Sequence, residues 1–244
     1  MAGIEPAMAP PQALSHKRER GSEVTRMEAF VDAAFAFAVT LLVISLDALP
    51  SSIPEFVVAL KGIPAFAGSF ALIAMFWWTH AVWSRRYGLQ DGISVLLSLV
   101  LVFLVLVYVY PLRMLFSSFF NWASQGWLPS SLVLRSYEDL LWMFVAYAIA
   151  WSTLGLVIVA LYRHAWKLRD DIQLSREERI ELQGDIATWS MIPLTGLLSL
   201  MLIGLCVLAG RPQLGGLSGF VYSLMSLSGV VGARARRRAQ RELA

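Results

Sequence analysis

Six long apolar runs constrain the fold of this chain more than any other feature of its sequence. At 1.5 Å of rise per helical residue, each run is long enough to cross the ~30 Å hydrocarbon layer of a bilayer. Their approximate limits are 27–49, 56–83, 93–116, 140–162, 186–209 and 214–233. We therefore expect an all-α membrane protein, built as a bundle of six transmembrane helices.

The bulk composition points the same way. Hydrophobic residues make up 57% of the 244 residues and charged residues only 15%, whereas a soluble domain has about 25% charged residues. We expect one transmembrane domain over residues 26–233. A disordered cytoplasmic tail is predicted before it at 1–25, and a basic cytoplasmic tail after it at 234–244.

The basic residues predict the topology of the bundle. Sixteen of the 20 lysines and arginines lie in the N-terminal segment, the second-to-third connection, the fourth-to-fifth connection and the C-terminal segment. The remaining connections hold only Lys61, Arg113, Arg135 and Arg211. Because cytoplasmic loops are enriched in lysine and arginine, both ends of the chain are predicted to be cytoplasmic. This alternation also favours an even number of spans.

The connection between the fourth and fifth spans, residues 163–185, has many charges of both signs. Within it, Ser175 followed by Glu178 matches a capping box and predicts the start of a short surface helix. We expect this connection to be solvated and to have no chemical role.

Enzyme chemistry finds little support in the sequence. Cys206 is the only cysteine, so the chain can form no internal disulfide, and no zinc-binding spacing is present. Sequence patterns of nucleophile elbows, zinc proteases and phosphate-binding loops are absent. We expect no enzyme activity, no cofactor and no metal. The basic residues follow membrane topology and show no pattern for tracking phosphates, so we expect no nucleic-acid partner.

The first span differs from the others in two respects. Asp32 lies within its first two turns, and acids inside spans are costly and typical of functional sites. The span is also rich in small residues, which allow neighbouring helices to approach closely. These are Ala29, Ala33, Ala34, Ala36 and Ala38.

Helical geometry separates the side chains of this span into faces. Four apolar residues follow one stripe, namely Phe30, Phe37, Leu41 and Ile44, and Thr40 lies at its edge. Asp32 precedes Phe37 by five residues, or about 140° around the helix. Asp32 is therefore expected to point towards a neighbouring helix and to find a hydrogen-bonding partner there.

The second span offers candidate partners near its cytoplasmic end. Trp77, His80 and Ser84 share one face by their spacing. We expect a cluster of Asp32, His80, a tryptophan indole N–H and Arg26, because burial favours charge pairing or neutralisation.

The segment from Arg26 onward, Arg-x-x-x-Phe-x-Asp-Ala-x-Phe-Ala-Phe-Ala-x-Thr-Leu-Leu-Val, resembles a known signature. It is similar to the first helix of prokaryotic homologues of the lysosomal potassium channel, the transmembrane protein 175 family. Trp77-x-x-His80 resembles the tryptophan–histidine stretch of that family. One departure is Val31, where the family has serine; another is Phe37, which is bulkier than the leucine or isoleucine expected there.

The resemblance implies a potassium-preferring cation channel in the prokaryotic plasma membrane. Its partners would be potassium ions, membrane lipids and further copies of the chain in a homotetramer, with the first helix of each subunit lining the pore. The implied apolar constriction is Phe37, Leu41 and Ile44, with Thr40 as a pore hydroxyl. The implied motif brace is Arg26, Phe30, Asp32, Trp77 and His80.

Other interpretations of these residues remain open from the sequence. Geometry alone favours a lipid-facing or packing role for the apolar stripe, and the Thr40 hydroxyl could bond to the carbonyl four residues earlier. A secondary transporter is the main alternative function. We see no inverted repeat, and Pro111 and Pro193 lie near predicted span ends and not at mid-span. A third possible function is a membrane enzyme that uses Asp32 and His80.

Overall fold

The computed structural model describes residues 20–21, 23–44 and 50–242. The regular elements in these ranges are all helical. They are α1 (Arg26–Ile44), α2 (Ile53–Lys61), α3 (Ile63–Tyr87), α4 (Gly92–Ala123), α5 (Tyr137–Lys167), α6 (Arg176–Leu208), the 3₁₀ helix η1 (Pro212–Leu227) and α7 (Ser228–Glu242).

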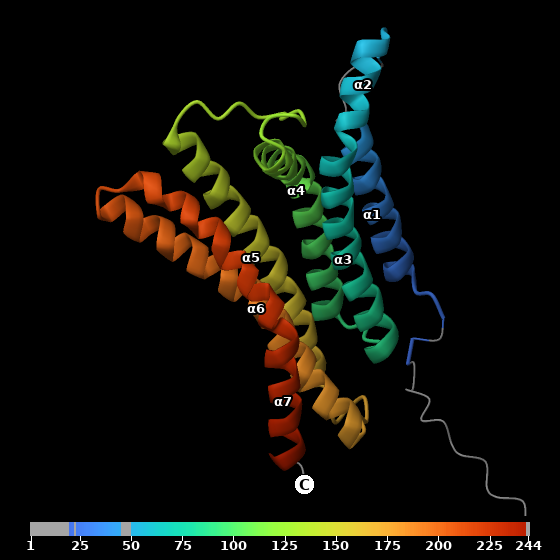
Figure 1. The fold of residues 1–244 in the computed structure, drawn as a ribbon. Helices are drawn as coiled ribbons and strands as arrows, with labels where there is room; N and C mark the ends of the chain where they lie inside the picture. Colours follow the sequence, from blue (N-terminus) through green and yellow to red (C-terminus); the bar gives the residue numbers. More distant parts are fainter. Residues whose placement is uncertain (1–19, 22, 45–49, 243–244) are drawn as a thin grey trace, which may run out of the picture.

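The helices form two groups that share the α4–α5 contact (Figure 1). In one group α1 packs against both α3 and α4. In the other α6 packs against α5, η1 and α7. The two groups diverge towards the end of the molecule where α2 lies (Figure 1).

Five described segments are long and apolar enough to cross a bilayer: 53–87, 92–123, 137–167, 176–208 and 212–242. Helix α1 adds a sixth apolar segment of 19 residues, or about 28 Å. The predicted continuation of the first span to residue 49 lies outside the described residues. Each predicted span thus overlaps one of these six segments, two of which consist of two helices each, and this confirms an all-helical, multi-pass membrane protein.

The topology prediction is supported by three ion pairs at one end of the bundle. Arg20 pairs with Glu178 at the start of α6, at 2.7 Å. Arg86, in the last turn of α3, and Arg236 of α7 both pair with Asp185, at 2.8 and 3.1 Å. The first and last described parts of the chain therefore lie at the same, basic end (Figure 1). This is the end that the positive-inside rule predicts to be cytoplasmic.

The second span is not one continuous helix, contrary to the prediction. It breaks at Gly62 between α2 and α3, and each of these helices has a proline in its first two positions, Pro54 and Pro64. A proline inside a helix lacks the N–H and clashes with the carbonyl four residues earlier. Pro64 therefore starts a new helix more favourably than it continues the old one.

The capping box of Ser175 and Glu178 is confirmed, but the predicted short surface helix is wrong. Helix α6 runs without interruption from Arg176 to Leu208, so it begins ten residues before the predicted span. Pro193 and Pro111 also differ from expectation, because they lie inside α6 and α4. Transmembrane helices tolerate prolines where neighbouring groups satisfy the freed carbonyls.

The sixth span begins as a 3₁₀ helix of 16 residues, where an α-helix was predicted. At about 2 Å per residue these residues cover ~32 Å, against about 24 Å as an α-helix. Its buried residues Gly215 and Ser218 are three apart, which matches a repeat of three residues per turn. The extended winding thus lets a short segment cross most of the bilayer before α7 begins.

Small residues allow α5 and α6 to pack closely. A Cβ atom on Gly196 would collide with the Ser152 hydroxyl, and one on Gly155 would collide with Ile192. Close helix approach at glycine is typical of membrane bundles. The Trp151 indole N–H adds a hydrogen bond to Thr195 Oγ1 across this interface, at 3.1 Å.

Candidate pore-lining face

Helix α1 is positioned by its first turn and by one buried face. Thr25 and Glu28 form a capping box, with both backbone-to-side-chain hydrogen bonds near 3 Å. This Thr-x-x-Glu pattern is a helix-start signal in the sequence, although the predicted first span begins after Thr25. The buried face packs against α3 and α4 and consists of Val31, Phe35, Ala38 and Leu42.

The opposite face of α1 is uncovered in the single chain. Phe30 and Phe37 are 52% and 55% exposed. Ala29, Ala33, Ala36 and Thr40 are also exposed on this side of α1, and Asp32 and Val43 are exposed at its edge. Because α1 lies at the edge of the bundle (Figure 1), this face is available to lipid or to another chain.

The predicted constriction residues do not all have the same environment. Phe37 is on the exposed face, whereas Leu41 is half-buried and packs against the core of the bundle. Ile44 ends the described part of α1, and its side chain lies outside the described residues. Phe37 and Thr40 are thus the two predicted pore residues whose side chains the structure places on the exposed face.

The hydroxyl of Thr40 donates a hydrogen bond to the carbonyl of Ala36, at 3.0 Å. This bond to the preceding turn uses the only proton of the hydroxyl. The oxygen keeps acceptor capacity, and Thr40 is exposed. A cation passing this face would therefore meet an oxygen and not a proton donor.

Asp32 finds a partner on α3. The indole N–H of Trp77 donates a hydrogen bond to Asp32 Oδ1, at 2.7 Å. Hydrogen bonds to an ionised acceptor are shorter and stronger than neutral ones. This hydrogen bond links α1 to α3 through Asp32 and Trp77, the two residues that the sequence patterns indicated. Arg26 and Phe30 are exposed, and among the described residues the Arg26 guanidinium forms no ion pair.

His80 does not join this cluster. It is buried, and its Nε2 lies 2.9 Å from the hydroxyl of Ser98 on α4. The Ser98 hydroxyl donates to the carbonyl of Ser94, at 2.8 Å, so we infer that His80 Nε2 has the proton and donates it. The expected contact with Asp32 is thus replaced by one with Ser98. Two serines four residues apart in an apolar span were the sequence signal for this partner.

The polar contacts continue towards the basic end of the bundle. The Ser94 hydroxyl donates to Asp91 Oδ1, at 2.6 Å, and His164 Nε2 lies 2.8 Å from Asp91 Oδ2. Asp91 caps the N-terminus of α4, and His164 belongs to the last turn of α5. A line of hydrogen bonds therefore joins α3, α4 and α5 behind the buried face of α1.

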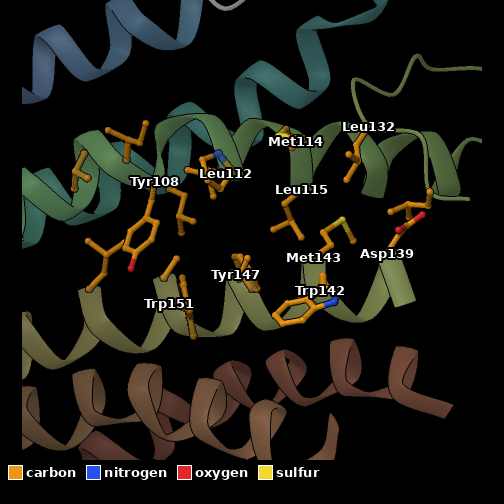
Figure 2. A pocket seen from close by; sticks show the side chains of 18 of the residues that line it. Tyr108, Leu112, Met114, Leu115, Leu132, Asp139, Trp142, Met143, Tyr147 and Trp151 are labelled. Atoms are coloured by element: carbon orange, nitrogen blue, oxygen red, sulfur yellow. The ribbon is translucent and has the colours of Figure 1, made fainter. Parts of the chain in front are cut away.

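An apolar cavity of about 540 Å³ lies elsewhere, between α3, α4 and α5. Figure 2 shows Leu112 and Leu115 facing Met143 and Tyr147 across it, with Asp139 at one end. Its lining includes no residue of α1. The cavity is therefore separate from the exposed face of α1. Among the described residues, no group of three His, Cys, Asp or Glu side chains is arranged to hold a metal ion.

Comparison with known proteins places this geometry in a family. The family described as "Endosomal/lysosomal potassium channel TMEM175" matches residues 26–111, which include α1, α2, α3 and most of α4. A protein of Marivirga tractuosa named "Potassium channel" is 33% identical over 210 residues, which cover 84% of each chain.

A solved structure has the same fold. It is the crystal structure of a threonine-to-alanine variant of the potassium channel MtTMEM175, in complex with a nanobody–MBP fusion protein. It aligns with a TM-score of 0.78 and 29% identity, covering 97% of this chain and 100% of that one. The chain is a multi-pass membrane protein that belongs to the TMEM175 potassium channel family.

Proposed function

We propose that this protein is a passive, potassium-preferring channel in which four copies surround one pore in a prokaryotic plasma membrane. The observation that supports it most is the uncovered face of α1, where Phe37 and Thr40 lie opposite a fully packed face. Because one face of α1 packs against α3 and α4, the opposite face can point towards a central axis. The curated relative and the solved structure are both named as potassium channels.

The side chains on this face suggest how such a pore would work. A ring of apolar groups from Phe37, with Leu41 and Ile44 further along α1, would exclude water and act as a gate by dewetting. A ring of Thr40 oxygens beside it would replace part of the ion's hydration shell. Potassium loses hydration water at a lower cost than sodium, so this arrangement favours potassium, to a moderate degree.

The contact between Trp77 and Asp32 would serve as a brace in this mechanism. It fixes the rotation of α1 relative to α3, and that rotation decides which side chains face the axis. His80 would contribute indirectly, because its bond to Ser98 joins α3 to α4, the second helix that supports α1.

Family membership weighs against the alternative functions. The relatives are named as channels, which favours passive conduction over a secondary transporter and over an enzyme. Asp32 and His80, the pair on which an enzyme would have been based, have separate partners, on α3 and α4.

Cation flux into liposomes with the purified protein tests this proposal. A potassium gradient is compared with a sodium gradient for the native protein and for Phe37→Ala and Ile44→Ala. We expect potassium flux to exceed sodium flux, and truncation of the constriction to raise total flux several-fold or to reduce the preference for potassium. Phe103→Ala on α4 is the matched control, since Phe103 is also an exposed phenylalanine, at 63%.

Two results would contradict the proposal. One is the absence of flux from every variant in folded oligomers. The other is an equal response to Phe37→Ala and Phe103→Ala, which would remove α1 from the pore wall.

A further inference from the structure

Helix α7 has one face that packs and one that does not. Gly232 and Ala239, seven residues apart, are buried on the packing face. A Cβ on Gly232 would collide with Thr188 of α6, so the two helices approach closely there. Arg236 lies on the same face and donates to Asp185 Oδ1, at 3.1 Å. The packing face of α7 is thus occupied by α6.

The opposite face is a stripe of four exposed arginines at i, i+3, i+4 and i+7. We call it the arginine stripe: Arg234, Arg237, Arg238 and Arg241. Arg238 pairs with Glu242, at 2.7 Å. In the described ranges, Arg234, Arg237 and Arg241 have no acidic partner. Three unpaired guanidinium groups therefore point away from the bundle on one side of α7.

The position of α7 relative to the membrane follows from Asp185. This carboxylate contacts both Arg236 and Arg86, and Arg86 is in the last turn of the transmembrane helix α3. Residues near Arg236 are therefore level with the cytoplasmic end of a span. At 1.5 Å per residue, Arg234, Arg237 and Arg238 lie within about 3 Å of this level along the helix, and Arg241 about 7–8 Å further.

The headgroup layer of one leaflet is roughly 5–8 Å thick. The arginine stripe therefore begins in this layer and ends at its aqueous edge. Guanidinium groups bind phosphate oxygens in a bidentate manner, and clusters of four to eight basic residues just inside a span are typical of sites for anionic lipids.

We propose that the arginine stripe of α7 binds the phosphate groups of anionic phospholipids in the cytoplasmic leaflet. The charge of the stripe and its depth in the membrane are what favour a lipid over a soluble partner. Lipid binding here would hold α7, and through Asp185 the N-terminal third of α6 and the last turn of α3, at a fixed depth. This inference does not depend on ion conduction.

Lipid selectivity of the full-length protein tests this proposal. The protein is placed in phosphatidylcholine vesicles with trace spin-labelled phosphatidylglycerol or spin-labelled phosphatidylcholine. Electron spin resonance then measures the motionally restricted fraction of each label. We expect a several-fold preference for phosphatidylglycerol that falls towards one in the triple variant Arg234→Gln, Arg237→Gln and Arg241→Gln. About 1 M salt should also reduce the preference.

The control removes the same number of charges at the other end of the bundle, in the variant Lys61→Gln, Arg135→Gln and Arg211→Gln. We expect it to keep the preference of the native protein. Equal preference in the stripe variant and the native protein, or equal loss in both variants, would overturn the proposal. If the glutamine stripe variant does not fold, the salt dependence of the native protein is the test. A phosphatidylglycerol preference of the native protein that does not change with salt would overturn the proposal.

Discussion

At the scale of single residues, Asp91 shows how a polar group is held at the basic end of the bundle. Partial burial favours its neutral form. Hydrogen bonds from Ser94, His164 and the backbone N–H of Ile93 outweigh this and hold the pKa of the Asp91 carboxyl below its usual value. Asp91 thus links the start of α4 to the end of α5 in its ionised form.

Because the folded-state pKa of Asp91 is lowered, its ionised form stabilises the protein above the unfolded-state pKa of ~3.9. That stability is lost as the pH falls through the folded-state value. Asp91→Asn keeps a good helix cap and removes the charge, so we expect about 1 kcal/mol less stability at neutral pH and a weaker loss in acid. Thermal unfolding in detergent from pH 7 to pH 3 measures both effects.

Asp171→Asn is the control for this prediction, because Asp171 is exposed in the α5–α6 turn and the described residues show no partner for it. If Asp91→Asn and the native protein lost the same amount of stability between pH 7 and pH 3, the Asp91 contacts would add no pH-dependent stability.

The partners of single residues were predictable only in part. The position of Asp32 on α1 indicated a partner on a neighbouring helix, and an indole N–H of α3 is that partner. His80 was assigned to the same cluster and instead contacts Ser98. Helical periodicity gives the direction of a side chain around its own axis. It does not say which neighbouring helix lies in that direction, and α4 packs on α3 as α1 does.

At the scale of elements, α5 and α6 depend on glycines for their close contact. A Cβ on Gly196 would collide with the Ser152 hydroxyl and approach the carbonyl of Ala148. We expect Gly196→Leu to destabilise the bundle by about 1–3 kcal/mol through overpacking. Thermal unfolding and size-exclusion chromatography measure the loss of stability and of the native oligomer.

Gly204→Leu on the same helix is the control, since a Cβ there has open space around it. Both substitutions gain helix propensity equally, so their difference isolates the contact with α5. Equal stability of the two variants would contradict this prediction, because it would mean that α5 and α6 can move apart at Gly196 without a loss of folding free energy.

The existence of each span was predictable because hydrocarbon requires long apolar helices. The helical structure within each span was less predictable. The apolar pattern that predicted this span has no signal for the 3₁₀ winding of η1 over residues 212–227. The charged first turns of α6 resembled a solvated loop, yet they continue the helix because Arg86, Arg20 and Arg236 neutralise their acids.

At the scale of the whole molecule, the single chain leaves the side of α1 that faces away from α3 and α4 uncovered. If α1 of each copy lies around a central axis, part of this side would line the pore and the rest would meet α1 of neighbouring copies. In a symmetric ring, each residue near the axis lies close to the same residue of neighbouring copies. This proximity distinguishes a pore-lining helix from a lipid-facing one.

Crosslinking through an introduced cysteine tests this arrangement. Cys206 is the only native cysteine, so Cys206→Ser gives a background without thiols. In that background we expect Phe37→Cys to form covalent dimers with a short bismaleimide reagent, and none larger, because each chain has one thiol. Phe103→Cys on α4 is the control, since Phe103 is also exposed, and it should stay monomeric on a denaturing gel. Dimers from Phe103→Cys alone would place α4, and not α1, at the contact between copies.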